Sequence, residues 1–309
     1  MPGKQQQEKM KKVILVAGGT GNLGGRIITS LLENGAQVRA IVRASSDPQK
    51  VEKLRRQGIE VVEADMTNVA EVTKACQNVS CVVSALSGLR DVIIDTQKVL
   101  LDAAVAAGVP RFIPSDFSLD FTNLAIEENR NLGLRKEFHQ YLNKAPIIST
   151  TIFNGAFADM LTGQMPLVLF KYKRVLYWGN ADQRMDFTTM DDTAAFTARA
   201  ALDDATPRFL RIAGDQLSAR EIREVASQVS GEKYSLFRPG GLGMFRLMIK
   251  VARMVAPGGD EIYPAWQGMQ YMHNMLDGRG HLTKLDNHRY PDLRWTTVQD
   301  VLTAHLATA

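Results

Sequence analysis

Short apolar runs alternate with longer amphipathic segments along the first half of the chain. Runs rich in β-branched and apolar residues predict strands at residues 13–17, 37–42, 60–63, 80–85, 111–114 and 147–153. Apolar residues at helical spacing predict helices over residues 22–34, 49–56, 69–75, 91–107 and 132–143. This alternation is typical of a parallel sheet covered on both faces. We therefore expect an α/β fold, a doubly wound parallel Rossmann sheet with ligands at the carboxyl ends of its strands.

The second half has a less regular pattern. It predicts strands at residues 167–170, 175–178, 209–212 and 235–237, and helices over residues 193–202, 219–230, 242–255 and 297–306. These elements indicate a smaller α/β lobe that supplies the wall of a substrate site. We expect a dinucleotide-binding domain over residues 1–155 and a substrate-binding lobe over residues 156–309. No linker or low-complexity tract separates them, so we expect close packing, with room for the chain to cross back.

A glycine turn follows the first predicted strand and opens the first predicted helix. Gly18, Gly21 and Gly24 are spaced G-x-x-G-x-x-G, one departure from the G-x-G-x-x-G fingerprint of dinucleotide-binding folds. A backbone that approaches phosphate oxygens closely cannot carry side chains at the contacts, and the N–H groups of a first helical turn attract negative charge. A glycine turn without a ligand is the alternative, but the strand before and the helix after favour a pyrophosphate site. We expect the intervening residues to line it as well: Thr20, Asn22 and Leu23.

Arg43 stands at the end of the second predicted strand, about 20 residues after the glycine turn, where NAD-binding proteins usually present a carboxylate to the ribose. A guanidinium can pair with a 2′-phosphate, which a carboxylate would repel. The sequence therefore favours NADP over NAD as cofactor. The alternative is a solvated arginine at a strand end.

Two further strand ends supply expected cofactor contacts. Asp65, followed by Met66, comes directly after the third predicted strand, where its carboxylate could accept a hydrogen bond from the adenine amino group. Capping of the next helix would explain this aspartate equally well. Ala85 and Leu86 end the fourth strand, and residues of that kind leave room for the cofactor to cross the sheet edge.

Hydride transfer usually needs a proton donor or electrophile near the nicotinamide. None of the seven tyrosines is followed four residues later by a lysine, so the Y-x-x-x-K pair of many short-chain dehydrogenases is missing. Lys136, on the helix before the sixth strand, is the remaining candidate catalytic group and a candidate contact to the nicotinamide ribose. The alternative is a solvated surface lysine, since Arg135 and Glu137 flank it.

Taken together, the glycine turn, Arg43, the segment 111–117 and Lys136 resemble the NmrA-like and isoflavone-reductase-like group of atypical short-chain dehydrogenases. The resemblance covers most of the sequence. It implies that Lys136 matches a catalytic lysine and that NADPH delivers hydride to an activated double bond or a benzylic carbon. The chain departs from the group at Asp116, where those reductases typically have glutamate, and its second half matches no substrate-defining motif.

We therefore expect an NADPH-dependent oxidoreductase that reduces a small or medium apolar carbonyl, enone or quinone. The substrate would lie between the carboxyl edge of the sheet and the second lobe, near Phe117, Asn154 and Phe157. The alternative is a non-catalytic, NADP(H)-binding regulatory protein that senses redox state, because a shared fold does not establish turnover. A homodimer or a regulatory protein partner stays open.

The composition of the chain argues against several other classes of function. The formal net charge is +4 and the basic residues are scattered, which argues against a nucleic-acid partner. Two cysteines, Cys76 and Cys81, are too few for a disulfide scaffold and favour a cytoplasmic setting. The five histidines lack metal-ligand spacing, so no metal site is expected.

We expect neither a targeting segment nor a membrane partner. Residues 1–12 are polar and charged, and no later stretch reaches the roughly 18 uninterrupted apolar residues of a spanning helix. Arg246, Lys250 and Arg253 fall on one side of an otherwise apolar predicted helix, a pattern compatible with a membrane surface or a partner groove. We expect instead a lid helix with a solvated basic edge.

Overall fold

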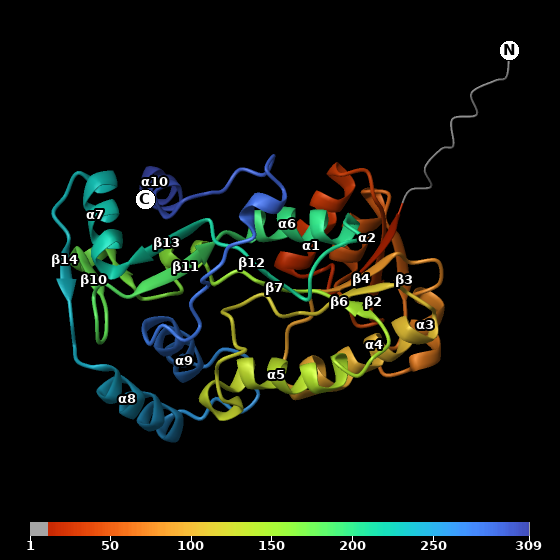
Figure 1. The fold of residues 1–309 in the computed structure, drawn as a ribbon, viewed down its shortest axis with the longest axis horizontal. Coiled ribbons are helices and arrows are strands. Elements are labelled where there is room, and N and C mark those ends of the chain that lie inside the picture. The colour runs from red at the N-terminus through yellow and green to blue at the C-terminus, as the bar shows by residue number, and fades with distance from the viewer. Residues whose placement is uncertain (1–11, 309) are drawn as a thin grey trace, which may run out of the picture.

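Six parallel strands form the central sheet of the computed structural model, which describes residues 12–308 (Figure 1). The expectation about a leader therefore lies almost wholly outside the described residues. The strands are β1 (Val13–Ala17), β2 (Gln37–Val42), β3 (Glu60–Glu63), β4 (Cys81–Ser84), β5 (Arg111–Ile113) and β6 (Ile148–Ser149). Their order is β3-β2-β1-β4-β5-β6, which reverses direction between β1 and β4. The predicted doubly wound fold is confirmed, and ligands of such sheets bind where the order reverses.

Successive side chains of the buried strands point to opposite faces of the sheet and pack into two separate hydrophobic cores. In β1, Ile14 and Val16 belong to a cluster on one face, whereas Leu15 and Ala17 belong to a cluster on the other. The flanking helices of the first half are α1 (Asn22–Glu33), α2 (Pro48–Arg56), α3 (Val69–Ala75), α4 (Gln97–Ala106) and α5 (Arg130–Leu142). Helices α1 and α2 cover the first face, and α3, α4 and α5 the second (Figure 1). Each was predicted to within a few residues, except that the helix expected over 91–107 begins with a π-helical turn, η1 (Asp91–Thr96).

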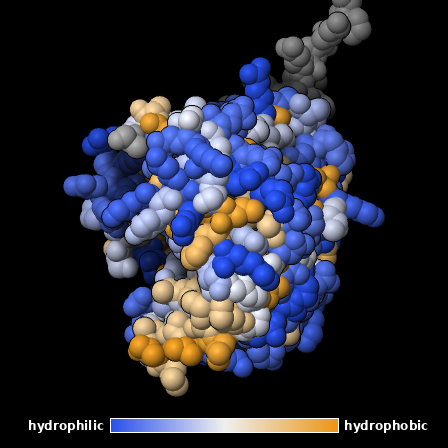
Figure 2. All heavy atoms as spheres, turned by 90° about the vertical axis from the view of Figure 1, so that its left-hand side faces the viewer, coloured by the Kyte–Doolittle hydropathy of each residue, from blue (hydrophilic) through white to orange (hydrophobic). Residues whose placement is uncertain are grey.

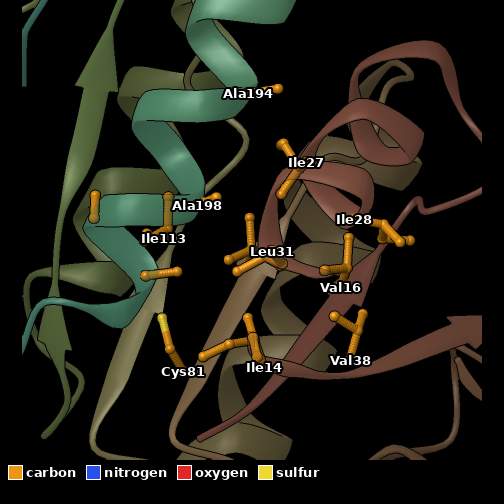
Figure 3. Close-up of a cluster of buried hydrophobic side chains, with 14 of the residues drawn as sticks. Ile14, Val16, Ile27, Ile28, Leu31, Val38, Cys81, Ile113, Ala194 and Ala198 are labelled. Carbon is orange, nitrogen blue, oxygen red and sulfur yellow. The ribbon is translucent and has the colours of Figure 1, made fainter. Parts of the chain in front are cut away.

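Helix α6 (Met190–Leu202) belongs to the second half of the sequence but packs on the central sheet beside α1. Ala194 and Ala198 face Ile27 and Leu31 of α1, as Figure 3 shows. Small side chains on α6 allow the two helices to approach closely. The chain therefore crosses back onto the first domain after residue 155, and the boundary placed there remains a prediction.

The strand predicted over residues 147–153 is divided in the structure. β6 pairs with β5, whereas β7 (Thr151–Phe153) pairs with β12 (Phe209–Arg211). The change of partner occurs at one peptide, because the Thr150 amide donates to the Phe112 carbonyl and the Thr151 amide donates to the Arg208 carbonyl. The prediction of one continuous strand was wrong because hydrophobicity does not reveal a change of sheet.

The second lobe contains two further small sheets. Their strands are β8 (Ala156–Phe157), β9 (Val168–Leu169), β10 (Arg174–Leu176), β11 (Arg184–Thr188), β13 (Asp215–Ser218) and β14 (Ser235–Phe237). The helices of this lobe are α7 (Ala219–Ser230), α8 (Leu242–Val255), α9 (Ala265–Leu276) and α10 (Val298–Thr308). β8, β11, β13 and α9 were not predicted. No helix among residues 12–308 is long and apolar enough to cross a membrane.

Arg111 ties α6 to the central sheet from inside the molecule. Its guanidinium is buried and donates to the carbonyl oxygen of Ala200 at 2.9 Å, and also to the Asp203 carbonyl and the Thr206 hydroxyl. These carbonyls lie at the end of α6, where the Ala200 carbonyl also accepts from the Asp203 amide at 3.3 Å and the Asp203 carbonyl lies beyond the last residue of the helix. Arg111 therefore donates hydrogen bonds to the carbonyl groups at the carboxyl end of α6 and fixes the position of the helix.

We expect Arg111→Met to lower the free energy of unfolding by about 2–4 kcal/mol, because three acceptors at the end of α6 would lose a buried, charged donor. Urea denaturation followed by circular dichroism measures this change. The matched control is Arg220→Met, which removes an exposed guanidinium paired with Asp182 and should leave the free energy of unfolding nearly unchanged. Equal midpoints for native protein and Arg111→Met would contradict the anchoring role.

Candidate functional site

The predicted glycine turn lies where β1, β4 and α1 meet. Gly18 has a φ of +84°, and a Cβ atom built there would stand 2.5 Å from the carbonyl oxygen of Ala85. A Cβ atom on Gly24 would stand 2.2 Å from the Gly18 carbonyl oxygen. A side chain at either position would clash with the backbone, so both residues have to be glycine. Without side chains, the backbone of the turn reaches the carboxyl edge of the sheet directly.

The first turn of α1 is open to an anion. Gly21 is the N-cap residue, and no side chain of the described residues caps the helix. The Gly21 amide is satisfied by the Gly18 carbonyl at 2.9 Å, but the amides that follow have no intrahelical acceptor. Gly21 and Asn22 are exposed, whereas Thr20 and Leu23 are half-buried. With no acidic residue in the first turn, the helix dipole is free to attract negative charge.

Arg43 is exposed at the carboxyl end of β2. A turn holds the backbone here: the Arg43 amide donates to the Ser46 hydroxyl at 3.1 Å, and the Arg43 carbonyl accepts from the Ser46 amide. Within residues 12–308 no acceptor is found for its guanidinium. The Arg43 cation therefore lies at the same edge of the sheet as the glycine turn, at the end of the strand next to β1.

The structure resolves one of the alternatives for Asp65. The N-cap residue of α3 is Asn68, which accepts from the Ala70 amide at 3.0 Å, so the capping interpretation of Asp65 was wrong. The Asp65 carboxylate instead accepts from the amide and hydroxyl of Thr67, both at 2.8 Å, and these bonds lower its pKa. The side chain of Met66 is buried in the core. Contacts of either residue to a cofactor remain predictions.

Ala85 and Leu86 connect the glycine turn to the end of β5. The Leu86 carbonyl accepts from the Ser115 hydroxyl at 2.6 Å, and the Ser115 carbonyl accepts from Nε of Arg135 at 2.9 Å. Arg135 is buried on α5 and also donates to the Asn131 carbonyl. The cation that reaches the sheet edge from α5 is thus Arg135, which sequence reasoning treated only as a neighbour of Lys136.

Lys136 points to the loop that follows β5. Its half-buried ammonium donates to the carbonyl oxygens of Thr122, at 3.0 Å, and Leu124. Successive residues of a helix point about 100° apart, so Arg135 and Lys136 contact different parts of the loop. The catalytic role of Lys136 remains a prediction.

The expected substrate residues lie together at the end of β7. Phe117 is buried, and the half-buried Phe157 packs against the same cluster. Asn154 is fully buried and its amide donates to the Ser118 carbonyl at 3.0 Å, which joins β7 to the loop after β5. Its side-chain carboxamide has no hydrogen-bond partner among the described residues. A buried amide without a partner is costly, so this group is available to a ligand or water.

Asp116 belongs to a buried network that sequence reasoning noted only as a departure from glutamate. Its Oδ2 lies 2.6 Å from Nε2 of His139 and accepts from the Thr151 hydroxyl at 2.7 Å. Arg208 donates to the same hydroxyl at 2.8 Å. Burial alone would raise the pKa of Asp116, but His139, Thr151 and Arg135 together hold it below its ordinary value. The network locks α5, β7 and the loop after β5 together.

Helix α9, in the second half of the chain, contacts the amino end of α5. Gln267, Gln270, Tyr271 and Asn274 recur at helical spacing on one side of α9. Three of them bond to the amino end of α5, with Gln267 Nε2 donating to Asn129 Oδ1 at 2.7 Å and the Arg130 amide donating to Gln270 Oε1 at 3.1 Å. Tyr271 lies among them, and its pKa is raised to about 12, chiefly by burial. The spacing is visible in the sequence, but nothing there shows which helix this side faces.

Comparison with known proteins identifies the family of the chain. A family model described as the NmrA-like family matches residues 10–238. The chain belongs to the NmrA-like family. The resemblance inferred from the sequence is therefore confirmed, on a span that includes the glycine turn, Arg43 and α5.

Relatives of this NmrA-like chain include plant reductases. The bifunctional pinoresinol-lariciresinol reductase of Linum perenne is 27% identical over 314 residues, covering 95% of this chain and 98% of the relative. The solved structure of AtPrR2 with NADP+ and (+)pinoresinol matches with a TM-score of 0.81 at 24% identity, covering 96% of this chain and 99% of that one. The NADPH-dependent quinone oxidoreductase QOR2 of Escherichia coli, complexed with NADPH, matches with a TM-score of 0.73 at 22% identity, covering 95% and 99%. The two structures share the fold of this chain.

We expect Asp116→Asn to lower the free energy of unfolding at neutral pH by about 3–5 kcal/mol, because it breaks a buried charged network. The folded-state pKa is lowered, so the carboxylate stabilises the protein above its unfolded pKa of about 3.9 and this contribution is lost as the pH falls through the folded value. Urea titrations at several pH values should therefore show a shallower acid decline for the variant. Asp102→Asn, at an exposed position of α4 with no side-chain hydrogen bond among the described residues, is the control. Parallel acid profiles for native protein and Asp116→Asn would refute the assignment.

Proposed function

We propose that the protein is an NADPH-dependent oxidoreductase that reduces a small or medium apolar carbonyl, enone or quinone. The observation that carries the proposal is the open first turn of α1 beside Gly18 and Gly24, where no side chain would fit. Arg43 lies just after the neighbouring strand β2, and its guanidinium has no acceptor within residues 12–308. The relatives support it, since they include a plant reductase by name and structures with NADP+ or NADPH.

The residues present fit this cofactor. Gly18 to Gly24 and the amides of the α1 first turn would hold the pyrophosphate, and Arg43 would hold the 2′-phosphate. Asp65, Met66, Ala85 and Leu86 would border the nucleotide. When bound, NADPH supplies the hydride.

The chain's own groups would bind and polarise the substrate. Phe117 and Phe157 form an apolar wall, and the Asn154 carboxamide offers a buried donor and acceptor beside it. Lys136 would stabilise negative charge that develops on the substrate oxygen, and Arg135 would fix the Ser115 backbone. Residues 156–309 would supply the substrate wall through α9, as the predicted domain division requires.

A second candidate is the NADP(H)-binding regulatory protein. One observation favours it: the Lys136 ammonium is already satisfied by the Thr122 and Leu124 carbonyls, so catalysis would require it to exchange a partner. Both candidates share the cofactor site and differ in turnover. For either, we propose a cytoplasmic setting, because Cys76 and Cys81 are free and buried.

We expect Arg43→Asp to weaken NADPH binding by about 10–100-fold, because a charged hydrogen bond to the 2′-phosphate is lost and a repulsive charge is gained. NADH binding should change much less. Fluorescence titration of both nucleotides measures the difference. Arg55→Asp, an equal charge change on the exposed surface of α2, is the control. A similar loss for both nucleotides would count against the 2′-phosphate contact.

We expect Lys136→Ala to lower kcat/KM for NADPH oxidation by about 100-fold or more, measured with a panel of quinones and enones. NADPH affinity should fall far less, because the pyrophosphate contacts remain. Lys144→Ala, at an exposed position just beyond α5, is the matched control. Tight NADPH binding with no turnover by native protein on any substrate would favour the regulatory candidate.

A further inference from the structure

Helix α8 carries a second apolar surface besides the one it buries. Its inner side holds Phe245 and Ile249, which are buried, and the Phe245 ring stacks on Trp178 with centroids 4.5 Å apart. Its outer side is apolar too, with side chains exposed by between 42% and 77%. These are Met244, Leu247, Met248, Val251, Met254 and Val255.

The six outer side chains form one continuous face. At 100° per residue they fall within an arc of about 120° along the whole helix. Figure 2 shows the resulting apolar surface at the bottom of the view, over α8, the helix at the lower left of Figure 1. An exposed apolar face of this extent is unusual for a protein surface and marks an interaction site.

Positive charge borders this outer face. Lys250 lies next to the edge of the outer face, Arg246 lies farther round the helix, and Arg253 lies over the Trp266 ring, 5.1 Å from its centroid; all three are exposed. Residues 233–263 include five basic residues and two acidic ones, Asp260 and Glu261, a net charge of +3 against a formal net charge of +4 for the whole chain. The preceding carboxylate, Glu232, is paired with Lys173 at 2.7 Å. The surface around α8 therefore complements a dense negative charge.

The segments on either side of α8 add exposed aromatic rings. Phe237 precedes the helix and is 39% exposed, and Tyr263 follows it and is 60% exposed. Aromatic side chains that are partly buried and partly exposed to water are enriched where a protein contacts lipid headgroups. An apolar helical face, a basic border and flanking aromatics together have the composition of a helix that lies in a membrane interface.

We propose that the outer face of α8 docks on a lipid surface that contains anionic headgroups. Phosphates and carboxylates of the headgroups would pair with Arg246 and Lys250, while the outer apolar side chains enter the acyl boundary. A second copy of the chain fits less well, because each copy would bring the basic residues of its own α8 to the contact. The absence of a spanning segment, on which the expectation of no membrane partner was based, does not bear on a helix lying flat on the surface.

The test is flotation of the full-length protein with vesicles of phosphatidylcholine containing phosphatidylserine, against pure phosphatidylcholine vesicles. We expect binding to the anionic vesicles that weakens with added salt. The triple variant Leu247→Gln, Val251→Gln, Met254→Gln should lose it by at least tenfold. The double variant Arg246→Gln, Lys250→Gln should lower the partition coefficient by about 30-fold, since each charge contributes about fivefold.

Controls separate docking from misfolding. The triple variant Val69→Gln, Ile148→Gln, Tyr172→Gln changes exposed apolar residues elsewhere and should float like native protein. Thermal unfolding and NADPH affinity should be unchanged in the α8 variants. No flotation of native protein, equal flotation of the α8 triple variant, or equal binding to uncharged vesicles would each overturn the proposal. A native dimer that the α8 triple variant converts to a monomer, without vesicle binding, would assign the face to a second copy instead.

Discussion

The close approach of β1, β4 and α1 at Gly18 is the constraint on which the site depends. The Gly18 carbonyl lies so near the backbone of α1 that Gly24 cannot carry a side chain, and Gly18 itself is pressed against Ala85. This crowding brings the first turn of α1 to the edge of the sheet without an intervening side chain. The unsatisfied amides of that turn, the end of β4 and Arg43 consequently share one edge. The local shape of the backbone, more than any reactive side chain, defines what this protein can bind.

A second set of contacts places the loop after β5. Ser115 bonds to the segment after β4 and to α5, Asp116 bonds to α5 and β7, Ser118 bonds to the residue after β7, and Thr122 accepts from Lys136 on α5. Asp116 is the buried centre of this set, because its carboxylate joins His139 to Thr151. The loop that would border a substrate is therefore held by polar contacts on all sides.

The parts of the fold that follow from local periodicity could be predicted, and the parts set by tertiary contacts could not. β1 to β5 and their helices were found because buried parallel strands are short apolar runs and the glycines that end helices are explicit. The division at Thr150 was missed because both halves are equally apolar, and β11 was missed because Asp186 interrupts it.

The same division applies to the site. Gly18, Gly24 and Arg43 occupy the positions expected from their spacing, since strand ends and turns are fixed in the chain. Arg135 and Tyr271 were not found, because their importance depends on how α5 and α9 are rotated about their axes, and adjacent residues in sequence gave no sign of it. The capping role weighed for Asp65 failed because Asn68 is closer to the helix start.

The change of partner at Thr150 has a mechanical consequence. A single extended segment is hydrogen-bonded to β5 of the central sheet through β6 and to β12 through β7, with no flexible linker between. Helix α6 also packs on the central sheet and is fixed there by Arg111. The second half of the chain is thus tied to the central sheet both through the β6–β7 segment and through α6, so a rotation about the peptide at Thr150 alone would break the contacts of α6.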